Sequence, residues 1–83
     1  MPLFMDVHNL SEAVSEADVA GAHEADLKTQ DKYGVKYKRF WVDDSGTKVF
    51  CLVEAPDAEA ANTVHREAHG LVADEIYHVS EHE

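Results

Sequence analysis

The chain has 83 residues, which is the length of one small domain, and we predict a single domain that spans residues 1–83. Seventeen Asp and Glu residues against seven Lys and Arg residues give a net charge of −10. A charge of this sign repels phosphate backbones and anionic lipid surfaces, so it argues against nucleic-acid and membrane partners and favours cations.

Three features bear on location. The single cysteine cannot form an intramolecular disulfide and suits a reducing compartment. The first residues contain no basic segment and reach an acidic side chain at Asp6, so they do not resemble a signal peptide. No apolar run approaches the roughly 18–20 residues of a membrane helix. We therefore expect a cytoplasmic protein.

The first part of the chain predicts a strand followed by a helix. Apolar and polar residues alternate over residues 3–10, which is the pattern of a half-buried strand. Ser15 can cap the next helix, and Asp18 three residues later forms a variant of the capping box. The helix has a narrow, alanine-rich apolar face. We expect it to end at Tyr33, with Gly34 as a left-handed cap.

The rest of the chain predicts a hairpin, a second helix and a last strand. Segments 35–42 and 47–54 are rich in β-branched and aromatic residues and flank a four-residue turn. Asp57 is a good N-cap for the second helix, and Gly70 is its stop signal. Residues 76–79 form a short final strand.

This order of strand, helix, strand, strand, helix, strand predicts an α+β fold of the ferredoxin-like plan. In that plan a four-stranded antiparallel sheet, with strand order 4-1-3-2 or near it, carries both helices on one face. No helix covers the other face, and we predict that it pairs in a homodimer. Phe50 and Leu52 are candidates for this open face, whereas Trp41 can lie on either face.

Histidine is the unusual residue, with six among 83. His65 and His69 are four residues apart on the second predicted helix, which places both imidazoles on one face within reach of one metal ion. The segment reads His-Arg-Glu-Ala-His, so its glutamate is one position too late for the zinc-protease motif. We predict metal binding without protease chemistry, and the alternative is two exposed histidines at helical spacing by chance.

The other four histidines are weaker candidates. His8 belongs to the first strand and His78 to the last, and the two need not be adjacent. His82 lies in the C-terminal tail, from which it can still join a site near a sheet edge. His23 shares a helix face with Asp26, which suits either a mixed nitrogen and oxygen metal site or a carboxylate that orients the ring. Each of them can equally be an ordinary surface residue.

Cys51 alternates with Val49 and Val53 in a predicted strand, so we interpret it as a buried small hydrophobe rather than a nucleophile. The chain has no glycine-rich phosphate loop, no Gly-x-Ser-x-Gly elbow and no Cys-x-x-Cys motif. The sequence therefore carries no recognisable catalytic signature.

Four segments that cover most of the chain carry a family resemblance. They are HEADLKTQDKYGVKY at 23–37, WVD at 41–43, VFCLVEAPDAEA at 49–60 and VHREAHGLVADEI at 64–76. Together they resemble a small bacterial family of nickel-binding, ferredoxin-like proteins. The resemblance implies a dimer that binds nickel for sequestration or handling rather than for catalysis. The family's recurrent positions are matched by His23, Cys51, His65 and His69.

The sequence thus favours a non-enzymatic protein that binds nickel or another divalent transition metal. We expect ligands from carboxylates and from His65, His69, His8, His78, His82 and His23, in part across a dimer interface. Imidazole suits nickel, copper and zinc, and carboxylates can complete an octahedral shell, but these residue types do not by themselves select nickel. Because imidazole must be neutral to bind, affinity should fall as the pH drops through about 6.5.

Two other functions stay open. One is an enzyme or small-molecule binding domain in a dimeric α+β barrel, with its pocket near Trp41, Tyr37, His8 and His23. This hypothesis is analogy from fold alone. The other is a structural or interaction protein whose histidines bind nothing. A pocket lined by aromatic and histidine side chains would favour the first, and absence of metal affinity the second.

Overall fold

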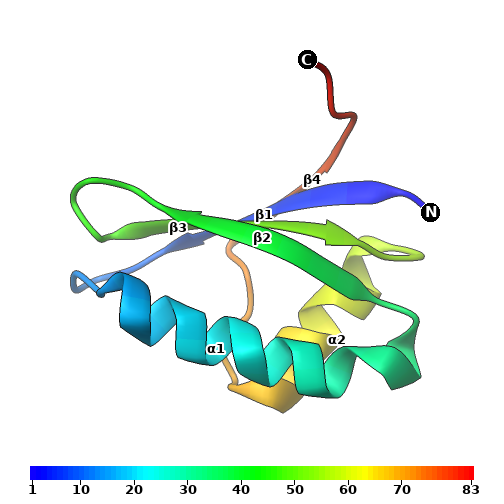
Figure 1. The fold of residues 1–83 in the computed structure, drawn as a ribbon, viewed down its shortest axis with the longest axis horizontal. Helices are drawn as coiled ribbons and strands as arrows, with labels where there is room; N and C mark the ends of the chain where they lie inside the picture. The colour runs from blue at the N-terminus through cyan, green and yellow to red at the C-terminus, as the bar shows by residue number, and fades with distance from the viewer.

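Four antiparallel strands form one sheet, and both helices cover the same face of it (Figure 1). The computed structural model describes residues 1–83. In chain order the elements are β1 Leu3–Asn9, α1 Glu16–Thr29, the short 3₁₀ helix η1 Gln30–Tyr33, β2 Lys36–Val42, β3 Lys48–Glu54, α2 Ala58–Ala68 and β4 Glu75–Val79. The strands lie in the order β2-β3-β1-β4, which confirms the ferredoxin-like arrangement.

Each helix begins at a side-chain cap that was predicted from the sequence. At α1 the Ser15 hydroxyl accepts a hydrogen bond from the Asp18 amide, and the Asp18 carboxylate accepts one from the Ser15 amide. At α2 the Asp57 carboxylate accepts a 2.8 Å hydrogen bond from the Ala60 amide. Gly34 ends η1 with φ 67°, the left-handed conformation expected of it.

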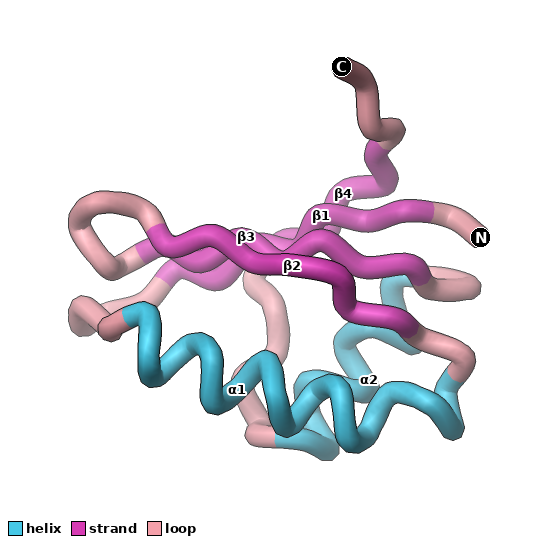
Figure 2. Tube along the Cα trace, viewed as in Figure 1, coloured by secondary structure: helices cyan, strands magenta, loops and turns pink.

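The core lies between the sheet and the two helices (Figure 2). From the sheet it takes alternate residues of each strand, including Phe4, Tyr37 and Val53. From α2 it takes Ala61 and Val64, both fully buried. Since paired residues of antiparallel strands share a face, the β1 register places Asp6 and His8 on this same face, opposite Cys51 and Val49.

The other set of strand residues lies on the open face. Phe50 and Leu52 belong to it, as predicted, because they alternate with the core residues of β3. A β-bulge between Tyr37 and Arg39 shifts the alternation of β2 by one residue. As a result Trp41 pairs with Phe50 on the open face, where its side chain is 45% exposed. The bulge has no signature in the sequence, which is why the face of Trp41 could not be assigned.

The connection from α2 to β4 runs from the helix layer to the sheet and closes one side of the core (Figure 2). Its far end is fixed to β1, because the Asp74 amide donates to the Val7 carbonyl and the Asp74 carboxylate accepts from the Asn9 amide. Neither α1 nor α2 is long and apolar enough to cross a membrane.

Candidate metal centre

His65 of α2 is the centre of a buried polar network. Its side chain is 1% exposed and lies below the sheet, one turn before the C-terminal end of α2. On one side its Nδ1 lies 3.0 Å from Asp26 Oδ1 and 3.2 Å from His69 Nε2. On the other side its Nε2 lies 2.9 Å from Asp6 Oδ2 and 2.8 Å from the Tyr37 hydroxyl. The spacing of His65 and His69 therefore does bring both rings together, as predicted.

Asp26 is a charged side chain that α1 buries rather than exposes. It is 2% exposed, and its Oδ1 contacts both His65 and His69, the latter at 3.1 Å. The sequence pairs Asp26 with His23 on α1, but in the structure its partners are the two histidines of α2. One carboxylate oxygen and two imidazole nitrogens thus converge on one point, and divalent transition metals accept both kinds of ligand.

Asp6 of β1 is fully buried on the opposite side of His65. Its Oδ2 accepts hydrogen bonds from the Tyr37 hydroxyl at 2.9 Å and from His65. Its Oδ1 has no hydrogen-bond partner, although His8 Nε2 lies 3.2 Å away. His8 itself is 7% exposed, and its ring meets that of His65 edge-on at 4.9 Å.

The network holds His65 in its charged form. Burial of the ring opposes this, but hydrogen bonds with Asp26 and Asp6 and their negative charges raise the pKa of His65 to about 9. Burial likewise disfavours the Asp6 carboxylate, but its contacts with His65 and His8 lower its pKa to about 2. Burial and the Asp6 charge raise the pKa of Tyr37 far above its ordinary value, so its hydroxyl stays protonated.

His69 is held as a single tautomer by the chain that follows it. The Leu71 amide donates a 3.1 Å hydrogen bond to His69 Nδ1, so this nitrogen carries no proton. The ring proton lies on Nε2, which faces Asp26. His69 is the accessible member of the network, with its side chain 14% exposed.

Cys51 of β3 lies among polar groups as well as apolar ones. It packs in the core with Val49 and Val53 and is 6% exposed, which confirms that it is buried. Burial and the nearby Asp6 carboxylate raise the pKa of its thiol well above its ordinary value. The thiol is therefore protonated in the metal-free protein.

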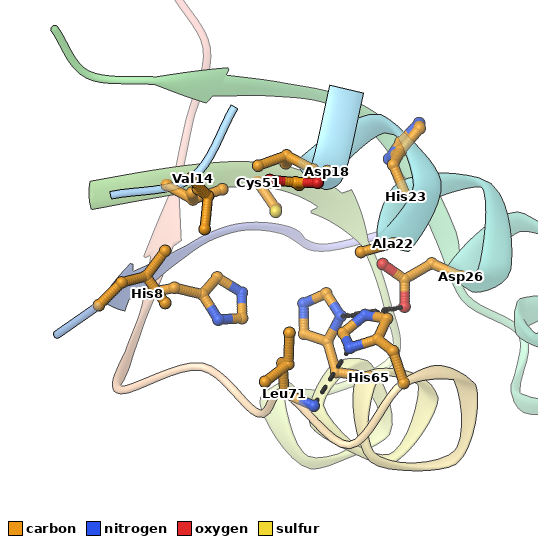
Figure 3. A pocket seen from close by; sticks show the side chains of 13 residues that line it. His8, Val14, Asp18, Ala22, His23, Asp26, Cys51, His65 and Leu71 are labelled. Carbon is orange, nitrogen blue, oxygen red and sulfur yellow. Dashed lines mark hydrogen bonds and ion pairs between the residues drawn. The ribbon is translucent and has the colours of Figure 1, made fainter. Parts of the chain in front are cut away.

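A cavity of about 120 Å³ lies beside these groups, between α1, the sheet and the segment after α2. Its walls include His8, Cys51, Asp26, His65 and Leu71, and Figure 3 shows the side chains of His8 and Cys51 directed into it. His23 also lines the cavity, and its buried Nδ1 has no hydrogen-bond partner.

Two groups of side chains have donor atoms close enough to hold a metal ion. We call Asp26, His65 and His69 the outer cluster, and Asp6, His8, Cys51 and His65 the inner cluster. Within each cluster the ligand atoms all lie within 4.8 Å of one another. His65 belongs to both clusters. The donor sets fit a divalent transition metal, because they combine imidazole with carboxylate and, in the inner cluster, a thiol.

Of the four weaker histidine candidates, two come to this centre and two do not. His8 and His23 line the cavity. β4 is adjacent to β1, but His78 is exposed and lies opposite Phe4, with the two rings 5.1 Å apart. His82 is exposed in the tail and contacts the Ser80 hydroxyl.

Two of the four residues proposed for a small-molecule pocket, His8 and His23, line the same cavity, and the other two do not. Tyr37 lies behind His65 and does not line the cavity, and Trp41 lies on the open face of the sheet. Glu67, the displaced glutamate of the His-Arg-Glu-Ala-His segment, bonds to Lys32 and Tyr33 instead of facing the histidines. Glu67 therefore points away from the histidines, as expected from its position in the segment.

Asp6 was missed as a member of the centre. The one signal in the sequence is its position between Phe4 and His8, with which it shares a strand face that turns out to be the helix-covered one. A carboxylate at such a position is normally solvent-exposed. Its burial is explained by its contact with His65, which lies 59 positions away in the sequence.

Comparison with known proteins gives a family. Residues 4–79 match the family described as "Nickel responsive protein SCO4226-like". The chain is also similar to the crystal structure of SCO4226 from Streptomyces coelicolor A3(2), with a TM-score of 0.88 and 36% sequence identity. That match covers 98% of this chain and 99% of the other. No curated protein matches the chain. The chain therefore belongs to the SCO4226-like family of nickel-responsive proteins.

Proposed function

We propose that this protein binds nickel(II) through the outer cluster, as a binding protein for sequestration or handling of the ion rather than as an enzyme. The observation that carries the proposal is the convergence of Asp26, His65 and His69 from two helices on one point. The nickel-responsive family to which the chain belongs supports this choice of ion. Imidazole and carboxylate are both ligands that nickel accepts.

The surroundings of the outer cluster also support this function. His65 would bind through Nδ1, while Asp6 and the Tyr37 hydroxyl remain at its Nε2 and hold the ring in place. Such outer contacts typically change metal affinity by 10–100-fold. Three protein ligands would leave an octahedral shell incomplete, and because Asp26, His65 and His69 all line the cavity, water there could complete it.

The test is calorimetric titration of the metal-free protein with nickel at neutral pH. A double variant His65→Ala/His69→Ala would leave the buried Asp26 carboxylate without a partner and remove the charged partner of Asp6, which can cost about 3–5 kcal/mol and unfold the chain. We therefore choose His69→Ala and Asp26→Asn. Each should weaken nickel binding by at least tenfold while circular dichroism shows a folded protein.

A matched control removes two histidines that lie outside the cluster. The double variant His78→Ala/His82→Ala should bind nickel as tightly as the parent. The reverse pattern, with binding lost in this control and kept in His69→Ala, would assign nickel to surface histidines and refute the proposal.

We propose further that two copies of the chain pair through the open faces of their sheets. Apolar side chains cover this face, and they include Met5, Val7, Phe50, Leu52 and Trp41. The outer cluster belongs to α1 and the end of α2, which lie on the other face of the sheet (Figure 1), so this pairing would not cover it. The single buried thiol is consistent with a reducing cytoplasm as the site of action.

A small-molecule binding function is the second candidate, because His8 and His23 line one cavity. The size of the cavity argues against a drug-sized ligand, since its volume of about 120 Å³ is below the roughly 300–1,000 Å³ of pockets for such ligands. A ligand that binds equally well to the parent and to His69→Ala, with no nickel affinity in either, would favour this candidate over metal binding.

A further inference from the structure

The inner cluster is a complete set of four ligands, of which the nickel proposal uses only His65. Asp6, His8, Cys51 and His65 offer one carboxylate oxygen, two imidazole nitrogens and one sulfur. All four residues are buried, with side chains from β1, β3 and α2. Cys51 looked like a core residue in the sequence, because strand alternation shows only its apolar neighbours.

The inner cluster also contains a buried oxygen atom that makes no hydrogen bond. Asp6 is fully buried, and although its Oδ2 is bonded to His65 and to the Tyr37 hydroxyl, its Oδ1 has no hydrogen-bond partner. A buried polar atom without a partner typically costs about 1–3 kcal/mol. A cation between Asp6 Oδ1, His8 and Cys51 would remove this cost, because it would bind the oxygen that the protein leaves free.

The spacing of the donor atoms fits a four-coordinate ion. In a tetrahedral zinc site with bonds of about 2.1 Å, neighbouring ligand atoms are about 3.4 Å apart. Asp6 Oδ1 and His8 Nε2 are already 3.2 Å apart, and His65 Nε2 is 2.9 Å from the other Asp6 oxygen. No pair in the cluster is more than 4.8 Å apart, so small side-chain rotations can close the shell. We infer that the inner cluster is a second metal site, which binds zinc(II) through Asp6, His8, Cys51 and His65.

Zinc binding at this site would release as much positive charge, in protons, as the ion brings in. The Cys51 S–H bond breaks, an S–Zn bond forms, and the thiol proton leaves to solvent. His65 loses the proton on Nε2 and keeps the one on Nδ1, which it donates to Asp26. One divalent ion thus enters as two protons leave, so the net charge of the buried network is unchanged. This equality matters because an uncompensated charge in the interior is costly.

The two clusters cannot be filled independently, because they share His65. Nickel in the outer cluster takes His65 Nδ1, and zinc in the inner cluster takes Nε2. Filling both at once would require the ring to lose both protons, so the two ions exclude each other. The predicted competition depends on the proposed nickel site, whereas zinc binding at the inner cluster does not depend on it. Thiolate favours zinc over nickel, so zinc should release bound nickel.

Cobalt(II) is the probe for the inner site, because it replaces zinc and shows a thiolate-to-metal charge-transfer band in the near ultraviolet. We expect this band in the reduced parent protein and in His69→Ala, and its disappearance in Cys51→Ser and Cys51→Ala. Zinc should abolish the band in the parent and bind at least tenfold more weakly to both Cys51 variants. Circular dichroism of the two variants separates loss of the ligand from loss of the fold.

Competition is then measured on nickel-loaded protein by adding one equivalent of zinc and dialysing. We expect nickel to be released from the parent and retained by Cys51→Ala. Cobalt binding without the thiolate band would refute the inner site, and the nickel proposal would stand if His69→Ala still lost nickel. If cobalt shows the thiolate band and His69→Ala binds nickel as tightly as the parent, the outer site is refuted and the inner site stands. Nickel retained by the zinc-treated parent, with the band present, would refute the competition.

Discussion

At the scale of single residues, His65 determines the chemistry of the centre. Its imidazolium faces the buried carboxylates of Asp26 and Asp6, which pair with its charge in the interior. His69, His8 and the Tyr37 hydroxyl complete its surroundings. The shift of its pKa from 6.5 to about 9 means that the folded state holds this proton more tightly than the unfolded chain does. The stabilisation is therefore complete below pH 6.5 and is lost as the pH rises through 9.

This shift predicts the pH dependence of the metal-free protein. The free energy of unfolding in urea should fall between pH 6 and pH 9.5 by on the order of 3 kcal/mol. Asp6 acts in the opposite direction, because its pKa of about 2 stabilises the fold above pH 3.8 and ceases to do so as the pH falls through 2. In Asp26→Asn the loss of stability at alkaline pH should be smaller, because the variant lacks one of the two carboxylates that raise the pKa of His65. An equally steep loss in that variant would show that the titrating group lies elsewhere.

At the scale of helices and strands, sequence reasoning went furthest where a signal is local. The caps of α1 and α2, the left-handed Gly34 and the order of the elements are set by residues a few positions apart, and all were predicted. The partners of Asp26 and the burial of Asp6 were not predicted. Both depend on contacts with His65, which is 39 positions from Asp26 and 59 positions from Asp6 in the sequence. The bulge in β2 also lacks a local signal.

The N-cap of α2 gives a prediction at this scale. Asp57→Ala removes the acceptor of the Ala60 amide and should lower the free energy of unfolding by about 1 kcal/mol. Nickel affinity should be unchanged, since His65 and His69 lie two turns or more further along the helix. The control is Asp44→Ala, which removes the same charge from the exposed β2–β3 turn and should leave stability within about 0.5 kcal/mol. Equal losses in the two variants would point to charge rather than capping.

At the scale of the whole molecule, the two faces of the sheet differ in what covers them. Both helices cover one face, where the candidate metal centre also lies, and no helix covers the other face (Figure 1). On that open face Trp41 and Tyr77 are 45% and 51% exposed. A standard interface buries about 800 Å² on each partner, which is about a sixth of this chain's 5050 Å² of accessible surface.

The dimer proposal predicts a mass in solution of twice 9.2 kDa by light scattering. Phe50→Glu places a charge at the centre of the open face and should give a folded monomer, because burying it unpaired is costly. Leu27→Glu changes an exposed leucine on α1 and should remain dimeric. A parent protein that runs as a monomer at micromolar concentration would refute the proposal.

The hydrogen bond from the Leu71 amide to His69 has a consequence for the backbone. It needs a bare Nδ1, yet a metal ion at Nε2 leaves the ring proton on Nδ1, where it points at the amide as a second donor. Nickel in the outer cluster would therefore detach Leu71, while the bonds of Ala73 to Asn62 and of Asp74 to Val7 keep the far end fixed. The released piece is only residues 71–72, because the Gly70 amide stays bonded to the His65 carbonyl. Nickel binding would thus make the backbone at Leu71 more mobile, and this change could be measured as faster hydrogen exchange of the Leu71 amide.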